Sequence, residues 1–136
     1  MTGEKNQCFS IPVRIYIEDT DAGGIVFYAN YLKFMERART EYIRSLGVEL
    51  RAGMKQNISY VVHSLEIKYQ KPAKLDDLVI VTANVSKVGK SYLVFEQYVI
   101  DENETVLVSA QVKVACVALD SGKPRALGSE LINALN

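Results

Sequence analysis

The sequence predicts an α+β fold in which an antiparallel sheet of about five strands packs on one long helix. Only one stretch, which begins near Asn30 and ends at Gly47, repeats apolar residues at three- and four-residue spacing. From Ile58 onward the helical period vanishes and apolar residues alternate along strand-like runs. The connections between these runs are short, which favours antiparallel pairing because parallel strands need longer crossovers. A helix and a sheet separated along the chain must bury their apolar faces on each other.

Length and composition favour one small cytoplasmic domain. The chain has 136 residues, and we expect a single domain over 1–136. Sixteen basic and sixteen acidic residues cancel, so no broad nucleic-acid-binding surface is expected. The start of the chain lacks the apolar segment of a signal peptide, and no apolar run approaches the ~20 residues that cross a bilayer. Cys8 and Cys116 suit a reduced compartment better than a disulfide scaffold.

The N-terminal part of the chain is expected to enter the fold through one strand. Residues 1–9 are polar and predict a frayed tail. From Ile11 to Ile17, branched apolar residues recur at nearly every second position, which predicts the first strand. A turn rich in Asp and Gly over 20–24 ends it.

The helix that follows has one apolar stripe and one charged face. Asn30 is the expected N-cap, and Gly47 is placed as the left-handed residue that follows the last turn. Arg44 near the end complements the negative end of the helix dipole. The stripe that must be buried against the sheet consists of Tyr31, Phe34, Met35, Ala38, Tyr42 and Leu46.

The remainder of the chain reads as strands. After a polar bridge at 48–57, a run with mixed faces from Ile58 to Tyr69 predicts an edge strand. The run 92–100 is apolar on both faces, which is typical of a central strand. Further strands are expected at 79–86 and 106–116, and a short terminal helix at 131–135.

Three carboxylates stand between the first strand and the helix. Glu18, Asp19 and Asp21 precede the glycines of the turn, and Asp side chains in such a position commonly bond nearby backbone N–H groups. A helix start also offers unpaired N–H groups and a positive dipole end. A carboxylate beside such an oxyanion receptor is what acyl transfer needs. From residue types alone, turn formation and catalysis both remain open.

The same stretch carries a longer signature. Glu18-Asp-Thr-Asp-Ala-Gly-Gly-Ile-Val-Phe-Tyr-Ala-Asn-Tyr31, followed by Glu36-Arg-Ala-Arg39, resembles the signature of hotdog-fold acyl-CoA thioesterases. The group is the 4-hydroxybenzoyl-CoA thioesterase family, and the resemblance is nearest to its bacterial branch associated with the Tol–Pal cell-envelope genes. Weaker similarity continues through Lys68–Asp77 to Lys123–Ala126. The resemblance implies a sheet curled round a central helix, paired edge to edge into a homodimer or homotetramer.

The resemblance also assigns roles to residues of the turn. Asp21 falls on the catalytic aspartate of the family, which acts as nucleophile on the thioester carbonyl or as general base on water. The matching backbone N–H at Tyr28 hydrogen-bonds the thioester oxygen in benzoyl-type members. The Tol–Pal-associated branch usually has His at this position, whereas hydroxybenzoyl-type enzymes carry Tyr. Gly24, Ile25 and Asn30 belong to the same signature and are expected at the substrate.

Other residues receive more modest roles. The turn at Lys90 and Ser91 matches one that contacts the nucleotide end of CoA in benzoyl-type relatives. Glu36 and Arg39 belong to the same signature and are interpreted as a solvated or structural ion pair on the helix, in preference to a functional one. His63 is interpreted as a structural histidine within a strand. One histidine and two unpaired cysteines do not offer the ligand spacing of a metal site, so neither a metal nor another cofactor is expected.

The function predicted is hydrolysis of an acyl-CoA thioester to a carboxylate and free CoA. Hydrolysis of acyl groups carried by acyl carrier protein is the alternative within enzymes. A hotdog module that binds acyl-CoA or a protein partner without turnover is the alternative outside them. The expected partners are therefore the acyl-CoA substrate and further copies of the chain, with no nucleic acid and no membrane span.

Overall fold

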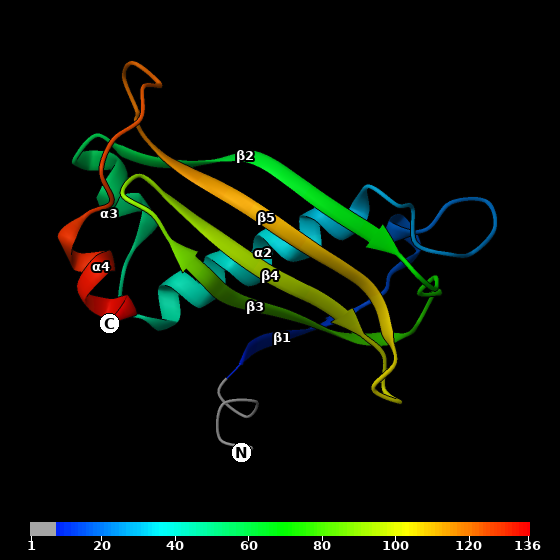
Figure 1. The fold of residues 1–136 in the computed structure, drawn as a ribbon. Helices are drawn as coiled ribbons and strands as arrows, with labels where there is room; N and C mark the ends of the chain where they lie inside the picture. Colours follow the sequence, from blue (N-terminus) through cyan, green and yellow to red (C-terminus); the bar gives the residue numbers. More distant parts are fainter. Residues whose placement is uncertain (1–7) are drawn as a thin grey trace.

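The computed structural model describes residues 8–136 (Figure 1). Five strands and one long helix dominate it. The elements in chain order are β1 (Phe9–Arg14), the 3-10 turn η1 (Ile17–Asp19), α2 (Asn30–Ser45), α3 (Leu50–Lys55), β2 (Ile58–Tyr69), β3 (Leu78–Val88), β4 (Tyr92–Ile100), β5 (Val106–Ala118) and α4 (Ser129–Leu135).

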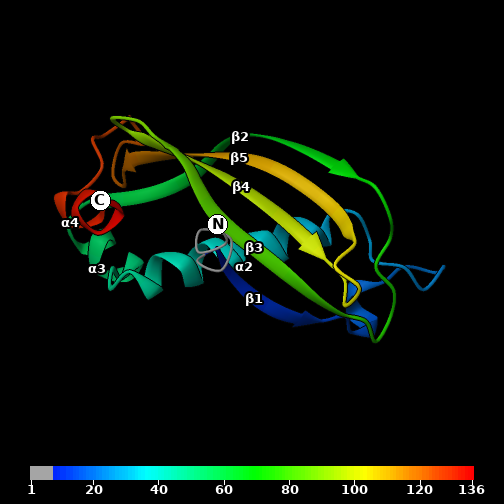
Figure 2. The same ribbon diagram turned by 60° about the horizontal axis from the view of Figure 1, so that its bottom comes forward.

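The strands form one antiparallel sheet in the order β1-β3-β4-β5-β2. The sheet curves around α2, which lies along its concave face, as Figures 1 and 2 show from two sides. β4 is the central strand, and β2 lies at one edge, where β5 is its one strand partner within residues 8–136. The predicted α+β class, the strand number, the central position of 92–100 and the edge position of 58–69 are confirmed.

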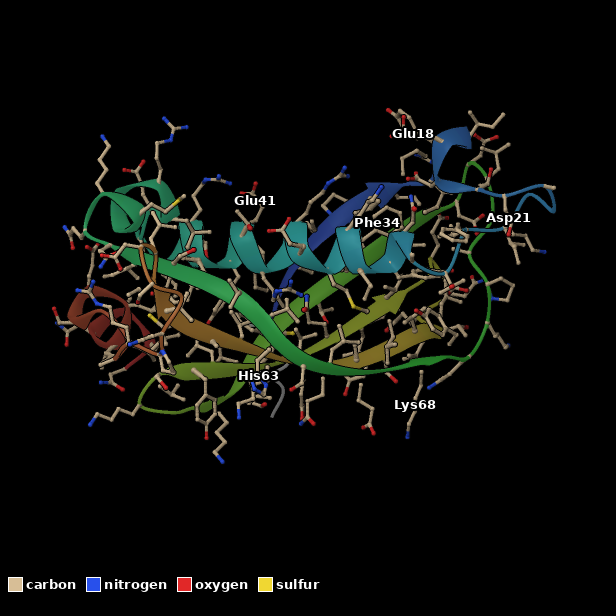
Figure 3. All side chains as sticks on the ribbon, turned by 90° about the horizontal axis from the view of Figure 1, so that it is seen from above. Glu18, Asp21, Phe34, Glu41, His63 and Lys68 are labelled. Atoms are coloured by element: carbon tan, nitrogen blue, oxygen red, sulfur yellow. The ribbon has the colours of Figure 1, made fainter. Side chains whose placement is uncertain are left out.

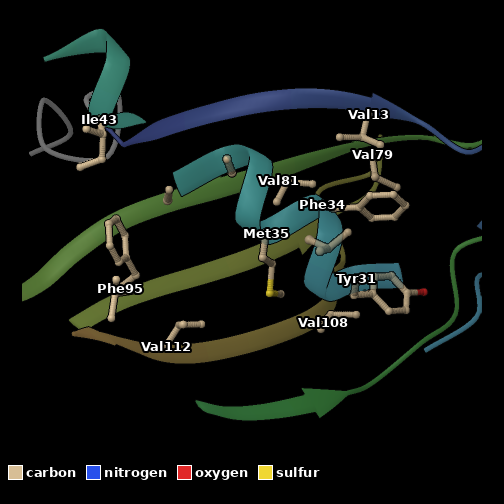
Figure 4. Close-up of a cluster of buried hydrophobic side chains, with 14 of the residues drawn as sticks. Val13, Tyr31, Phe34, Met35, Ile43, Val79, Val81, Phe95, Val108 and Val112 are labelled. Carbon is tan, nitrogen blue, oxygen red and sulfur yellow. The ribbon is translucent and has the colours of Figure 1, made fainter. Parts of the chain in front are cut away.

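The helix packs through the stripe that its sequence predicts. Phe34 and Met35 are almost completely buried, with 1% and 0% of their surface exposed, and they face the middle of the sheet (Figure 4). Leu, Met and aromatic side chains in a helix lean toward the preceding turns, which lets residues three and four apart fill one surface. Ile43 extends the buried stripe, whereas Tyr42 and Leu46 are only partly buried.

The two ends of α2 differ from each other in how well the sequence predicts them. At the far end, Gly47 has a φ of 85°, and its N–H and that of Val48 donate to the carbonyls of Arg44 and Ile43. This is the expected glycine-terminated helix end. At the start, the prediction that Asn30 caps the helix is wrong. Ala29 is the cap residue, and the Asn30 side chain is directed to a different partner, described below.

The first strand lies two to three residues earlier than predicted. It covers Phe9–Arg14 and not 11–17. Ile15 forms backbone hydrogen bonds with the turn at 76–77 and so leaves the ladder. The chain then bends into η1, where the side chain of Ile17 is 75% exposed. The predicted tail over 1–9 falls mostly on residues 1–7, outside the described part of the chain. Phe9 is in β1, paired with Ala83.

The polar bridge at 48–57 contains a helix that the sequence analysis missed. α3 is only six residues long, too short to show a helical period, and contains Gly53. An added Cβ at Gly53 would lie 3.7 Å from the Ile58 side chain, so α3 packs closely on the start of β2. The terminal helix is confirmed, although it begins at Ser129. None of the helices within 8–136 has the length and apolarity needed to cross a membrane.

Candidate functional site

The loop between β1 and α2 is organised by Asp19. Its carboxylate oxygens accept hydrogen bonds from the Tyr16 N–H (2.8 Å) and the Asn30 side-chain amide (2.9 Å). Its carbonyl accepts from the Phe27 N–H at 2.9 Å. Asp19 is 8% exposed, so these bonds satisfy a buried charge. Of the three carboxylates in the loop, Asp19 therefore holds the loop to the start of the helix.

This role makes a prediction about stability. Asp19→Ala leaves the Tyr16 N–H and the Asn30 amide without their acceptor, and we expect the free energy of unfolding to fall by about 2 kcal/mol. Urea unfolding followed by circular dichroism measures it. Glu18→Ala is the matched control, because the Glu18 side chain is exposed and is expected to matter by less than about 0.5 kcal/mol. Equal stability of the two variants would contradict the role of Asp19.

A tight hairpin presents Asp21 next in the chain. Thr20 pairs with Val26, and the Asp21 N–H donates to the carbonyl of Ile25 at 3.1 Å. Gly24 closes the turn by donating to the Asp21 carbonyl, with a φ of 78° that a residue with a side chain adopts at a cost. The Gly24 carbonyl in turn accepts from the Leu75 N–H, which fixes the hairpin to the loop before β3.

The Asp21 carboxylate lies exposed beyond the start of α2, as Figure 3 shows. Its Oδ1 accepts a hydrogen bond from the Gly23 N–H at 3.0 Å, so the turn-forming role open in the sequence is present. Within residues 8–136, Oδ2 has no hydrogen-bond donor. The turn therefore holds one oxygen of this carboxylate and leaves the other accessible. Asp21 can therefore form the turn through Oδ1 while Oδ2 stays available to a ligand, so the two roles left open by the sequence do not exclude each other.

Unpaired backbone donors lie at the start of α2. The N–H of Phe27 is bonded to Asp19, but the N–H of Tyr28 has no acceptor among the described residues. The Tyr28 carbonyl accepts from the hydroxyl of Tyr69 at 3.2 Å, and the two rings meet edge to face with centroids 6.1 Å apart. The backbone at position 28 is thus held from β2 while its N–H stays available.

A cavity of about 240 Å³ opens beside these donors. The hydroxyl of Tyr31 accepts from the Ala73 N–H at 3.0 Å, and burial raises the pKa of Tyr31. Tyr69, which lies 41 residues from Tyr28, was not identified from the sequence, because no local pattern links the two. The cavity is lined by Ile25, Val26, Tyr28, Tyr31, Tyr69, Gln70, Lys71 and Pro72.

The structure brings together some of the predicted site residues and separates others. Asp21, Gly24, Ile25 and Tyr28 share one end of the molecule, and Asn30 lies there with its amide bonded to Asp19. The turn at 89–91 lies at the opposite end of the sheet, beside α3 and α4 (Figures 1 and 2). The carbonyls of Lys90 and Ser91 accept from the Leu127 and Cys116 N–H groups there.

The remaining candidates have no part in this end of the molecule. The predicted ion pair of Glu36 with Arg39 is wrong: Glu36 accepts from Thr40, and Arg39 donates to Gln97. His63 is exposed on β2, with Nδ1 3.2 Å from the Ser64 hydroxyl. In the described part of the chain, no three His, Cys, Asp or Glu side chains gather in a way that could hold a metal ion.

Comparisons with known proteins match this arrangement. Residues 23–108 match the model of the Thioesterase superfamily. The acyl-CoA thioesterase YbgC of Haemophilus influenzae is 48% identical over 124 residues, which cover 90% of each chain. The acyl-CoA thioester hydrolase YbgC of Escherichia coli O157:H7 is 40% identical over 124 residues, with 91% of this chain and 92% of the relative covered.

Solved structures agree with these similarities. The crystal structure of a probable thioesterase from Bartonella henselae is 34% identical, with a TM-score of 0.83 over 89% of this chain and 99% of the other. The DHNA-CoA thioesterase of Staphylococcus aureus has a TM-score of 0.89 at 24% identity, covering 94% of this chain and 88% of that one. The second likeness concerns the fold alone.

Proposed function

This chain belongs to the thioesterase superfamily, and from that membership we propose that Asp21 and the Tyr28 N–H form the site at which it hydrolyses an acyl-CoA thioester. The activity is that of an acyl-CoA thioesterase: thioester and water give a carboxylate and free CoA. The fold is the hotdog fold that the sequence resemblance implied.

The free oxygen of Asp21 supports two routes. As nucleophile, Oδ2 forms a bond to the acyl carbon, the C–S bond breaks, CoA leaves as the thiol after gaining a proton, and water then cleaves the mixed anhydride. As general base, the carboxylate takes a proton from a water that attacks the same carbon, and the proton passes to the departing sulfur. Each route consumes only thioester and water, and we propose that neither metal nor redox cofactor takes part.

The negative charge that develops on the carbonyl oxygen needs a donor. The Tyr28 N–H is held at the start of α2, where the helix dipole is positive, and no acceptor among the described residues occupies it. Removing one such donor in other enzymes costs about 3 kcal/mol of transition-state stabilisation. A backbone donor carries this role for any side chain at position 28.

The observation that carries the proposal is the difference between the two aspartates of the loop. Both Asp19 oxygens accept hydrogen bonds from the protein and the residue is buried, so its carboxylate is not accessible to a substrate at the surface. Asp21 is exposed and keeps one oxygen free. Steady-state hydrolysis against aroyl-, short-chain and long-chain acyl-CoA tests the activity and ranks its substrates.

The role of the Tyr28 backbone leads to a prediction for its side chain. Tyr28→Phe keeps the N–H and removes a hydroxyl that makes no hydrogen bond within residues 8–136, so kcat should stay within about twofold of wild type. Tyr69→Phe is the matched variant, because it removes the hydroxyl that holds the Tyr28 carbonyl. A loss for Tyr28→Phe as deep as that of Asp21→Asn would instead place the phenol in the chemistry.

We propose further that the complete site requires two copies of the chain. β2 has a free edge that carries exposed Val61, Val62 and Leu65, and an unpaired edge invites strand addition. β2 runs from Ile58, at the end with the 89–91 turn, to Tyr69, at the end with Asp21. Antiparallel pairing of β2 with its copy about a two-fold axis would therefore bring Lys90 and Ser91 toward the partner's catalytic end.

Assembly and location follow the same reasoning. A homodimer is the smallest closed assembly that a two-fold axis allows, and stacking of two dimers into a homotetramer would bury further surface. The proposed compartment is the cytoplasm, where acyl-CoA is present. Acyl carrier protein remains the alternative carrier of the acyl group, and a parallel assay with acyl carrier protein thioesters distinguishes it.

A further inference from the structure

A row of three cavities lies along α2 and β2, and we call this row the groove. The first is the cavity beside Tyr28 and Tyr69, which shares no wall residue with the other two. A second cavity lies between Leu32 on α2 and Leu65 on β2, and a third, of about 140 Å³, continues toward Ile43. The second and third cavities share Glu36, Arg39 and Val62 as walls.

The third cavity is apolar except at one side. Its walls come from the sheet and from the far half of α2, and the apolar ones are Ile43, Leu50, Val62, Leu93, Phe95 and Val114. A cavity of this kind suits a methylene chain, because removing each CH₂ group from water is favourable. The walls that carry polar groups are Glu36, Arg39 and Thr40 on α2 and Tyr60 on β2, and Arg39 is the positively charged one.

Arg39 is anchored to the core by one hydrogen bond. Its Nη1 donates to Oε1 of Gln97 at 3.0 Å, and Gln97 is completely buried, donating in turn to the carbonyls of Met35 and Thr82 at 3.0 Å each. A fixed glutamine therefore sets the position of the guanidinium. A guanidinium has five N–H donors, and within residues 8–136 only this one is used.

No carboxylate in the described chain forms an ion pair with Arg39. Glu36, one turn earlier, is the nearest candidate, but it accepts from the Thr40 hydroxyl at 2.7 Å and forms no ion pair with Arg39. Burial lowers the pKa of Arg39, and the charge of Glu36 partly offsets this effect. A partly desolvated guanidinium with spare donors is a receptor for an anion. Lys33 and Arg37 line the adjoining cavity and add positive charge.

The distance from the reacting centre to Arg39 sets the length of the ligand. Arg39 is nine positions after Asn30 on the helix, which corresponds to about 14 Å along the axis. This is the reach of a medium-length acyl chain whose thioester lies at the helix start. Resting on the proposed function, we propose that the groove accepts acyl groups that carry a carboxylate at their far end and that Arg39 binds this carboxylate, so that half-thioesters of dicarboxylic acids are preferred.

The test compares two thioesters of matched length, dodecanedioyl-CoA and lauroyl-CoA. We expect wild type to have a kcat/KM at least about tenfold higher for the first, since a charged hydrogen bond contributes 1.5 kcal/mol or more. Arg39→Met fills similar space without charge and should abolish that ratio through KM while lauroyl-CoA turnover stays near wild type. Arg39→Lys should retain part of it. Arg44→Met, at an exposed arginine of α2 that lines none of the three cavities, is the control and should leave the ratio unchanged.

The outcomes separate this inference from the proposed function. Hydrolysis of both thioesters by wild type at a ratio near one overturns the role of Arg39 and leaves thioesterase activity standing. The same conclusion follows if Arg39→Met lowers both activities equally, because that is the behaviour of a purely structural arginine. Hydrolysis of neither thioester, nor of any acyl-CoA in the wider panel, overturns both. If Arg39→Met fails to fold, the wild-type ratio and the Arg39→Lys variant decide.

Discussion

An Asp21→Asn variant is expected to hydrolyse acyl-CoA with a kcat lower by about 10²–10⁴-fold, the usual range for loss of a general base or its equivalent. The amide keeps the shape of the side chain, and its oxygen can still accept from the Gly23 N–H, so the hairpin should persist. What is lost is the charge on the free oxygen. Steady-state kinetics with saturating acyl-CoA measures kcat, and KM should change far less.

Glu18→Gln is the matched control for this variant. Glu18 is an exposed carboxylate of the same loop, and Figure 3 shows it at the same end of the molecule as Asp21. Its neutralisation should leave kcat within about twofold, as for other surface substitutions. If Asp21→Asn retained more than about a tenth of wild-type kcat, the loss of transition-state stabilisation would be too small for a catalytic carboxylate, and the assignment of Asp21 would be wrong.

Proline at position 62 is expected to remove both assembly and activity. Val62 is in the middle of β2, next to a register irregularity, and proline lacks the N–H that a strand paired on both sides needs. We expect Val62→Pro to sediment as a 15.2 kDa species and to lose about 10²-fold in activity, since a site built from two copies would lose its positioning groups. Sedimentation velocity and acyl-CoA hydrolysis at one concentration measure both.

Val62→Ala separates the backbone effect from the side chain. It removes most of the groove-lining side chain but keeps the N–H, so we expect the assembly of wild type with a smaller change in activity. A Val62→Pro protein that stayed assembled and active would show that the β2 edge is not the interface. If circular dichroism shows that Val62→Pro is unfolded, the mass of the active wild-type protein in sedimentation decides whether the chain assembles.

The periodicity of the sequence predicted the elements that bury many residues. The stripe from Tyr31 to Ala38 and the two-sided apolar run of β4 are visible because helix and strand periods differ, and burial enforces them over many residues. α3 was not predicted, because its six residues are fewer than two helical turns and show no clear period. Its packing on Ile58 depends on the tertiary structure.

The candidate site was predicted less completely. The signature predicted Asp21 as the functional carboxylate before the helix, and only the hydrogen bonds of the folded chain distinguish it from Asp19, which has the same chemistry two residues away. The side-chain amide of Asn30 donates a hydrogen bond to Asp19 and does not cap the helix. Local residue preferences cannot show this choice of partner. Tyr69 reaches Tyr28 through the fold. The separation of the 89–91 turn from the end of the sheet that carries Asp21 is visible only in the folded chain, and the proposal of a second copy is based on it.

The most direct test of a catalytic site shared between two copies is active-enzyme sedimentation of the wild-type protein. Acyl-CoA hydrolysis is followed in the centrifuge cell, so the measured mass is that of the species that turns over substrate. We expect activity to migrate at twice the 15.2 kDa of the chain or at a higher multiple. Activity that migrates with a 15.2 kDa monomer would contradict the shared site, even if Asp21 proved essential.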